Sequence, residues 1–359
     1  MKKILIVPTL GLDLEGITSV IYNYTKAMDR SGLQISFLTY GDLKPSVRQR
    51  FEPLGEILFV SDRKQSTGAY LKDLAALLKE RSFDTVHING NSGTMFLEVF
   101  IARLCGVKNI IVHAHSTRTD HPLVNAVLKH PMIWLSRTVI ACSEATGKWL
   151  YGRYPYTLLN NAIELSNFRY REDLRRQYRE EFGVGEEFLI GHVGHFTEPK
   201  NHFFLIDIFA RFHSLEPASK LLLISDGPRF AQVQEKVRQL GLEDAVIFAG
   251  RRSDVAGIYS AMDLFILPSC WEGRPLVLVE AQVNGLPVLV SNVVTGAAKC
   301  TDRIFYKPLE DGAQSWAEQL RELQKRDVDR SVDSVPDIAA KGFDIHKEAE
   351  KLRKLYLKR

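Results

Sequence analysis

The sequence lacks several features that would place it in a specialised class of protein. It has only four cysteines, and none stands at the spacing of metal ligands. Its longest apolar runs, such as KLLLIS, have the length of a strand and are too short to cross a bilayer. It also has no GxGxxG dinucleotide fingerprint, because Gly11 and Gly16 are five residues apart. These absences argue against a disulfide-stapled, membrane-spanning or dinucleotide-binding protein, and they fit a reducing cytoplasm.

There is also little excess of charge of either sign, since the formal net charge is +4. Residues 1–160 hold 19 Lys and Arg against 13 Asp and Glu, whereas the rest of the chain holds 28 against 30. A basic first half favours an anionic acceptor or a membrane surface, although ordinary surface variation explains it equally well. No stripe of basic and aromatic residues is present, so a nucleic-acid partner is not expected.

What the chain does have is a regular alternation of short apolar runs with segments of helical period. The predicted strands are KILIVP, QISFLT, ILFV, DTVHI, NIIVH, RTVIAC, FLIGHVG, KLLLIS, AVIFAG, DLFILP, PVLVS and RIFY. The first of them lacks a signal-peptide cleavage site and therefore reads as a strand. Between strands, GITSVIYNYTKAMD places Ile17, Val20, Ile21, Tyr24 and Met28 on one helical face, which we interpret as core. This alternation is typical of parallel sheets with helices on both faces.

The alternation is interrupted once, between residues 152 and 185, and then restarts. We therefore predict an α/β protein with two Rossmann-like, doubly wound domains facing each other across a cleft. The predicted boundaries are 1–165 for the N-terminal domain and 166–342 for the C-terminal domain. The last segment, 343–359, reads as a basic amphipathic helix that packs back toward the first domain; such a helix could also touch a membrane.

The segment Ser269–Pro287, SCWEGRPLVLVEAQVNGLP, follows a predicted strand and carries the clearest chemical signal. Pro275 suits the first position of a helix that Gly285 ends, so Glu272 precedes the helix and Glu280 lies within it. Free backbone N–H groups at the start of a helix favour an anion such as phosphate. The two carboxylates are better suited to accept hydrogen bonds from hydroxyls, so the pattern indicates a phosphorylated ligand rich in OH groups. The alternative is an ordinary solvated helix face.

In this context Glu272 and Glu280 resemble the Glu-(seven residues)-Glu motif of glycosyltransferase family 4, the retaining group 1 enzymes with the GT-B fold. The resemblance implies that Glu272 lies by the donor sugar and that Glu280 binds the ribose hydroxyls of the nucleotide. It also implies that the residues between them, at the start of the helix, contact the donor: Gly273, Arg274, Pro275, Leu276 and Val277.

A second segment, GHVGHFTEPKNH, resembles the family segment in which a basic residue and a lysine grip the donor diphosphate. Lys200 matches the lysine, whereas His195 stands where the family usually has arginine. Histidine offers no bidentate fork, so either His195 is protonated or the grip relies on Lys200 and backbone N–H groups. Arg274 could supply the missing charge, and Arg274→Ala is then expected to raise the donor KM more than His195→Ala.

Three further donor contacts are implied by the resemblance. Gly227 belongs to a Gly-rich turn beneath the nucleotide, and Gly16 to the Gly-rich loop after the first strand. Arg251 follows AVIFAG, where backbone groups of the family receive the base, so the side chains of Arg251 and Arg252 are expected to be solvated.

On the acceptor side, His115 matches a histidine that in the family lies near the reacting sugar, and Asn89 is another polar strand tip. His113 and His115 could form a metal pair, but no third ligand stands at suitable spacing, and we interpret His113 as a core residue. Asp327-Val328-Asp329 has the spelling of a metal-binding motif, yet no strand precedes it. No metal is therefore expected.

Taken together, the resemblance implies a metal-independent, retaining hexosyltransferase of the exopolysaccharide or capsule type. It would move a sugar from a nucleotide-diphosphate donor, with a UDP-sugar favoured, to a hydroxyl of a lipid-linked or growing surface glycan. Its expected catalytic residues are His115, Lys200 and Glu272, without a cofactor. The expected location is the cytoplasm, with peripheral contact at the inner membrane face. A GT-B sugar-nucleotide epimerase and a non-catalytic nucleotide-sugar-binding subunit remain as alternatives.

Overall fold

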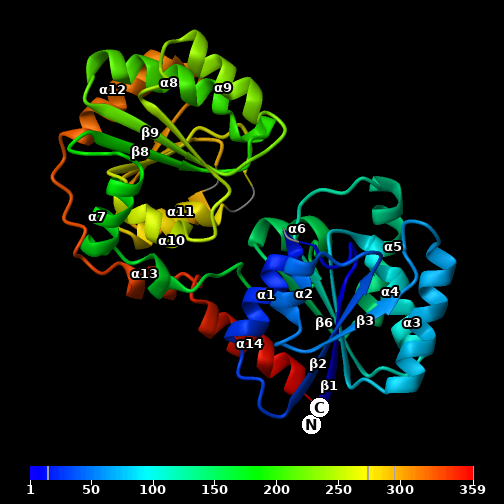
Figure 1. Cartoon of the computed structure of the whole chain (residues 1–359). Helices are drawn as coiled ribbons and strands as arrows, with labels where there is room; N and C mark the ends of the chain where they lie inside the picture. Colours follow the sequence, from blue (N-terminus) through cyan, green and yellow to red (C-terminus); the bar gives the residue numbers. More distant parts are fainter. Residues whose placement is uncertain (14–15, 273–274, 295, 359) are drawn as a thin grey trace. The chain divides into compact units, whose positions relative to one another are not determined.

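The computed structural model describes residues 1–13, 16–272, 275–294 and 296–358. The chain divides into two compact units (Figure 1), of which unit 1 comprises Met1–Ile163 and Gly342–Arg359 and unit 2 comprises Glu164–Lys341. Each unit has its own sheet and its own core, and each is described by itself. No helix in the described ranges is long and apolar enough to cross a membrane.

Unit 1 is built on a parallel sheet with the strand order β3-β2-β1-β4-β5-β6-β7. Its strands are β1 (Lys2–Pro8), β2 (Leu33–Tyr40), β3 (Glu56–Val60), β4 (Thr85–Gly90), β5 (Asn109–Ala114), β6 (Thr138–Ala141) and β7 (Thr157–Leu158). The order reverses between β1 and β4, which is the topological switch point of a doubly wound sheet.

Helices cover both faces of this sheet (Figure 1). One face packs against α3 (Thr67–Arg81), α4 (Phe96–Leu104), α5 (Pro122–Leu135) and α6 (Glu144–Tyr151), with the short η1 (Gly93–Met95) preceding α4. The other face packs against α1 (Ile17–Ala27), α2 (Pro45–Phe51) and α14 (Ile345–Leu357). The apolar face of α14 is therefore buried on unit 1, and the predicted stripe of α1 packs in the same core.

Unit 2 repeats the plan with the strand order β10-β9-β8-β11-β12-β13, all parallel. Its strands are β8 (Phe188–Val193), β9 (Ser219–Ile224), β10 (Val246–Gly250), β11 (Leu264–Leu267), β12 (Val288–Ser291) and β13 (Ile304–Lys307). Here the order reverses between β8 and β11, so that these two strands form the switch point.

Helices again cover both faces of the sheet of unit 2. One face packs against α8 (His202–Leu215), α9 (Phe230–Gln239) and α12 (Gly312–Gln324). The other packs against α7 (Glu172–Glu181), α10 (Val255–Ile258), η4 (Tyr259–Ala261) and α11 (Leu276–Val283). The remaining short elements are η2 (Leu165–Phe168), η3 (Glu198–Lys200), η5 (Gly296–Ala298), η6 (Leu309–Asp311) and α13 (Val335–Ala340).

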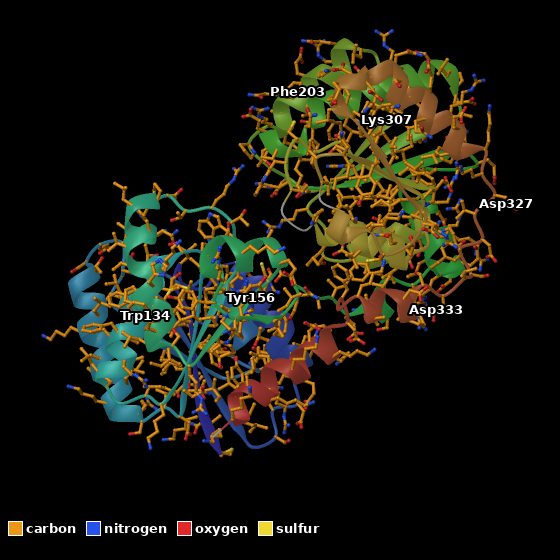
Figure 2. The ribbon with its side chains drawn as sticks, turned by 180° about the vertical axis from the view of Figure 1, so that it is seen from behind. Trp134, Tyr156, Phe203, Lys307, Asp327 and Asp333 are labelled. Atoms are coloured by element: carbon orange, nitrogen blue, oxygen red, sulfur yellow. The ribbon has the colours of Figure 1, made fainter. Side chains whose placement is uncertain are left out.

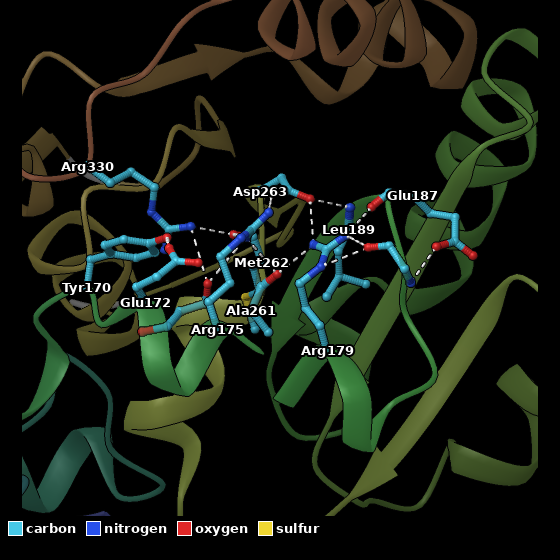
Figure 3. Close-up of polar contacts among 12 residues, drawn as sticks. Tyr170, Glu172, Arg175, Arg179, Glu187, Leu189, Ala261, Met262, Asp263 and Arg330 are labelled. Atoms are coloured by element: carbon cyan, nitrogen blue, oxygen red, sulfur yellow. Dashed lines mark hydrogen bonds and ion pairs between the residues drawn. The ribbon is translucent and has the colours of Figure 1, made fainter. Parts of the chain in front are cut away.

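At the amino-terminal end of β11, an ion-pair network around Asp263 fixes helix α7 to the sheet (Figure 3). Arg175 Nη2 lies 2.6 Å from Asp263 Oδ1, and Arg179 Nη1 lies 3.1 Å from Oδ2. The backbone N–H of Leu189 donates to Oδ2 at 2.7 Å. Arg330 donates to the carbonyl of Met262 at 2.7 Å, and burial lowers the pKa of its guanidinium to about 10.

The twelve strands predicted from the sequence are all present, and the fold class is confirmed. The seventh strand of unit 1, β7, was missed because its two residues lie among turn formers in GRYPYTLL. The start of α11 was one residue too early: Pro275 has an extended ψ of 113° and precedes the helix, which begins at Leu276. Gly285 follows its end at a φ of +76°, as a helix-terminating glycine should.

Candidate functional site

The polar residues of unit 2 gather at its switch point, beyond the ends of β8 and β11. Ligands of open parallel sheets bind at such points because the loops there leave in opposite directions and open a crevice. The loop after β8 contains η3, which ends at Lys200, and the loop after β11 carries Glu272. The two residues predicted to contact the donor diphosphate and the donor sugar therefore come from neighbouring strand ends.

Lys200 and Glu272 form a close ion pair, with 2.6 Å between Nζ and Oε1. Their side chains are only 20% and 11% exposed, so the pair is largely withdrawn from water. The hydroxyl of Ser269 donates to the same carboxylate oxygen at 2.8 Å. Glu272 thus keeps one oxygen engaged by protein groups, and the pair joins a cation and an acceptor of hydrogen bonds at one point.

Two hydrogen bonds hold the loops that carry this pair. The backbone N–H of Cys270 donates to the carbonyl of Pro199 at 2.8 Å, and the side-chain amide of Asn201 donates to the carbonyl of Pro268 at 3.1 Å. Asn201 is a non-glycine residue with a positive φ, +56°. Because Asn tolerates the left-handed region, it can turn the chain here between η3 and α8. Sequence reasoning did not find Ser269 or Asn201.

Glu280 lies on the second turn of α11 and has a partner that the sequence did not indicate. The phenol of Tyr259, which is fully buried, donates to Glu280 Oε2 at 2.8 Å. Burial raises the pKa of Glu280 to about 7, and the hydrogen bond from Tyr259 acts in the opposite direction. At neutral pH the carboxyl is therefore poised between its two protonation states, with one oxygen fixed by the phenol.

The start of α11 is also where several donor contacts were predicted. Leu276 and Val277 are its first residues, and no described side chain caps this end. Its first backbone N–H groups are thus left to another acceptor, as an anion site requires. Gly273 and Arg274 lie outside the described residues.

The loops after β8, β9 and β10 converge around Asp226. His195 Nδ1 lies 3.2 Å from Asp226 Oδ1, and Arg251 Nη1 lies 4.0 Å from Oδ2. Gly227 has a φ of +153°, and a Cβ there would come within 2.6 Å of the backbone of Phe196, so only glycine fits. These predicted residues are thus brought together beside the switch point.

Arg252 corrects one expectation, because its side chain is paired rather than solvated. Its guanidinium lies 2.6 Å from Glu181 Oε1 and 2.6 Å from Asp254 Oδ2. The residue connects α7 with the loop after β10, and this is a structural role.

Unit 1 presents a smaller polar group at its own switch point. Asn89, at the end of β4, accepts a backbone hydrogen bond from Thr9, which follows β1. His115, after β5, has its Nε2 3.0 Å from Asn89 Oδ1. The two residues predicted for the acceptor side are therefore in contact. Gly16, predicted to contact the donor, caps α1 with a φ of +61°.

His113 lies buried behind His115, in a row of three imidazoles. Its ring centroid is 4.1 Å from that of His115 and 5.5 Å from that of His87. Burial lowers the pKa of His87 and of His115 to about 3 and that of His113 in the same direction, so the three rings are neutral at physiological pH. Across the described ranges, no group of three or more His, Cys, Asp or Glu side chains could hold a metal ion.

A buried ion pair that the sequence did not reveal lies beside Thr9, the residue that is hydrogen-bonded to Asn89. Arg63 Nε lies 3.1 Å from Oε1 of Glu98, whose side chain is fully buried. The guanidinium of Arg63 also donates to the carbonyl of Thr9 at 3.3 Å and to that of Thr94 at 3.4 Å. Arg63 thereby reaches the loops after both β1 and β4. The two partners are far apart in the sequence and share no spacing pattern.

The Asp327-Val328-Asp329 motif, of which Asp327 is labelled in Figure 2, lies by the amino-terminal end of β13 rather than at the carboxyl ends of the strands. The carbonyl of Asp329 accepts from Arg303, which immediately precedes β13, and its carboxylate accepts from Ser331. The motif therefore lies at the amino-terminal ends of the parallel strands, whereas the Lys200–Glu272 pair lies beyond their carboxyl ends.

Comparison with known proteins accounts for both units. Residues 175–323 match the family model described as Glycosyl transferases group 1, and residues 14–166 match that of Glycosyltransferase Family 4. HepE from Anabaena, in a crystal structure with UDP and glucose, has a TM-score of 0.77 and 17% identity, and the similarity covers 99% of each chain. This likeness shows that the fold is shared.

Relatives in sequence carry the comparison beyond the fold. The UDP-Gal:alpha-D-GlcNAc-diphosphoundecaprenol alpha-1,3-galactosyltransferase of Escherichia coli is 27% identical over 344 residues, which cover 88% of this chain and 85% of that protein. The putative glycosyltransferase EpsF of Bacillus subtilis (strain 168) is 30% identical over 300 residues, covering 79% of this chain and 78% of EpsF. The chain belongs to the group 1 glycosyl transferases, and it is a glycosyltransferase with two Rossmann-like domains.

Proposed function

We propose that this glycosyltransferase moves a sugar from a UDP-sugar to a hydroxyl of a lipid-linked or growing surface glycan, with retention at the anomeric carbon. The observation that carries the proposal is the Lys200–Glu272 pair at the β8/β11 switch point, a few residues before the start of α11, which no described side chain caps. A cation and free backbone N–H groups suit a diphosphate, and a carboxylate beside them suits sugar hydroxyls.

In this proposal each residue has a defined task. Lys200 and the first N–H groups of α11 stabilise the negative charge that develops on the leaving diphosphate. Glu272 accepts hydrogen bonds from the sugar, while Ser269 holds its carboxylate in place. Glu280 accepts from the ribose through the oxygen that Tyr259 leaves free. His115, neutral and oriented by Asn89, contacts the sugar or the acceptor hydroxyl.

The choice of substrates rests on the relatives. The name of the Escherichia coli relative specifies a UDP-sugar donor and a lipid diphosphate acceptor. HepE was crystallised with UDP and glucose. Another relative, 40% identical over 111 residues that cover 31% of this chain and 19% of that protein, is a Vi polysaccharide biosynthesis protein of Salmonella typhi. We extend these substrates to the present chain as a proposal, together with a cytoplasmic location, peripheral contact with the membrane and independence of divalent metal.

The first experiment is a thermal-shift screen of the full chain against a panel of nucleotide sugars. Because a ligand that binds only the folded state stabilises it by mass action, the true donor should raise Tm most, and its nucleotide diphosphate should raise it as well. The best donor is then incubated with lipid-linked acceptors, and the product is analysed by NMR. An axial donor sugar that gives an axial linkage supports retention, whereas an inverted linkage contradicts it.

Two controls separate this proposal from its alternatives. Incubation with the donor alone should give no epimerised sugar nucleotide, and an epimer would identify an epimerase. Transfer should also persist when EDTA is present, and its loss would contradict independence of metal. Donor binding accompanied by neither transfer to any acceptor nor slow hydrolysis of the donor would indicate a binding subunit.

A further inference from the structure

The outer face of α5 is apolar, although a surface helix ordinarily turns polar side chains to solvent. Leu123, Val127 and Trp134 stand at positions i, i+4 and i+11 and therefore share one helical face. They are 82%, 70% and 68% exposed. The inner face is already packed: Met132 lies in the core, and Asn125 Oδ1 accepts a hydrogen bond from the backbone of η1 at 2.7 Å. The helix is thus fixed in place with these three large apolar side chains in solvent, and Val124 beside them is 43% exposed.

The neighbouring helix and loop extend this feature. Helix α4 packs against α5 and exposes Phe100 and Leu104. We call these five side chains the α5 surface: Leu123, Val127 and Trp134 of α5 with Phe100 and Leu104 of α4. The indole N–H of Trp134, labelled in Figure 2, donates to the hydroxyl of Tyr154 at 3.1 Å. Tryptophan and tyrosine with an apolar body and a polar tip are typical of the boundary between lipid and water.

The chain segment that carries α5 and most of α4 has charge of one predominant sign. Residues 99–158 hold seven Lys and Arg against two Asp and Glu. Helix α5 itself contains no acidic residue. Arg103, Lys108 and Lys148 are among the exposed basic side chains of this segment. An apolar stripe within a basic segment is complementary to a surface with an apolar interior and anionic head groups.

We propose that the α5 surface binds the surface of a membrane that contains anionic phospholipids. The apolar stripe enters the head-group region, and the basic side chains contact phosphates. A second copy of the chain is a poorer occupant, because an isologous contact would bring two basic segments together.

This inference deepens the proposed function, and its value to catalysis rests on that function. Helix α5 follows β5 through residues 115–121, which begin with His115. Asn125 also fixes it to η1, in the loop after the strand that ends near Asn89. A membrane under α5 would therefore lie beside the acceptor end of unit 1. A lipid-linked acceptor could present its hydroxyl there while its lipid stayed in the bilayer.

The test is flotation of the full chain with vesicles of phosphatidylcholine alone and of phosphatidylcholine mixed with phosphatidylglycerol, without any sugar. The chain should bind the mixed vesicles more tightly, and high salt should weaken that binding. The triple variant Leu123→Ser, Val127→Ser, Trp134→Ser should lower the partition coefficient at least about thirtyfold, because it removes three apolar side chains from the lipid. A matched variant, Phe59→Ser, Leu240→Ser, Val332→Ser, changes exposed apolar residues elsewhere and should stay within about twofold of the parent.

Several results would overturn the inference. They are a parent chain that binds neither kind of vesicle, equal losses in the two triple variants, and a solution dimer that the α5 variant dissociates without affecting flotation. The donor-induced rise in Tm should be the same in the parent and both variants, which shows that the units are folded. Vesicle binding is measured without donor or acceptor. It therefore stands or fails independently of sugar transfer.

Discussion

The two ends of strand β11 carry charge clusters that are built differently. At its beginning, Asp263 is engaged by Arg175, Arg179 and a backbone N–H, so both oxygens are used (Figure 3). Just beyond its end, Glu272 is held through one oxygen, by Lys200 and Ser269. The first cluster is complete within the protein. Among the described residues, the second cluster leaves one carboxylate oxygen and the first N–H groups of α11 without a side-chain partner, so that they can interact with a ligand.

This difference separates charges that stabilise the fold from charges that serve chemistry. When a carboxylate has all of its partners within the protein, its replacement lowers the free energy of unfolding, because the cations that it paired with stay buried without a partner. The Lys200–Glu272 pair is expected to separate when the donor binds, so its residues should contribute mainly to catalysis. The comparison therefore predicts opposite patterns of activity and stability at the two ends of one strand.

The largest expected effect is on catalysis by Lys200→Ala. The variant removes the cation proposed to face the leaving diphosphate, so kcat should fall about 10²- to 10³-fold. The measurement is release of nucleotide from the preferred donor in the presence of acceptor. Lys236→Ala is a matched control, because the Lys236 side chain is similarly exposed and forms an ion pair of 2.6 Å with Asp207, which joins α9 to α8 and does not involve Glu272. An equal fall in kcat for both variants would contradict the assignment.

The second effect is on stability at the other end of the strand. Asp263→Asn leaves two guanidinium groups without a carboxylate, so the free energy of unfolding should fall by about 3 kcal/mol. Urea unfolding measures it, and kcat of the folded variant should change little. Asp311→Asn, which changes a more exposed carboxylate with a single cationic partner, Lys307, should cost about 1 kcal/mol or less. A stable Asp263 variant with a large loss of kcat would reverse the comparison.

The sequence predicts the framework of both clusters but only part of each. Short apolar runs identified twelve strands, because a parallel strand that is buried on both faces consists of an almost unbroken run of apolar residues. Glu272 and Lys200 could be found because their loops resemble family motifs. Ser269 lies in the same segment and was missed, since a hydroxyl at a strand end has many structural uses. Tyr259 and Arg63 meet their partners only through tertiary packing, and such contacts leave no spacing pattern in one sequence.

The third prediction concerns pH and Glu280. Since the pKa of its carboxyl is about 7, the charged form that accepts best from ribose hydroxyls should increase through neutrality. The donor kcat/KM should therefore rise as pH passes about 7. Stability should show the opposite sign: the folded pKa lies above the ordinary value of 4.5, so the unfolded chain loses its proton first and stability falls between these two values. Glu280→Gln should flatten both profiles.

Tyr259→Phe sharpens this prediction. Because its hydrogen bond lowers the pKa of Glu280, removal of the hydroxyl should move the inflection of kcat/KM to higher pH. Phe keeps the ring in the core, and a profile that drops in height without moving would assign Tyr259 a packing role alone.

The smallest effect is expected at His195, where the chain departs from the usual arginine. His195 and its partner Asp226 are both well exposed, so water screens their interaction and His195→Ala should raise the donor KM by no more than about fivefold. Arg274→Ala should raise it further if that residue replaces the missing charge, and donor KM values of the two single variants and the double variant decide between them. Should His195→Ala have the larger effect, His195 rather than Arg274 would supply the charge that the usual arginine provides, and both cationic groups at the diphosphate, Lys200 and His195, would come from the loop after β8.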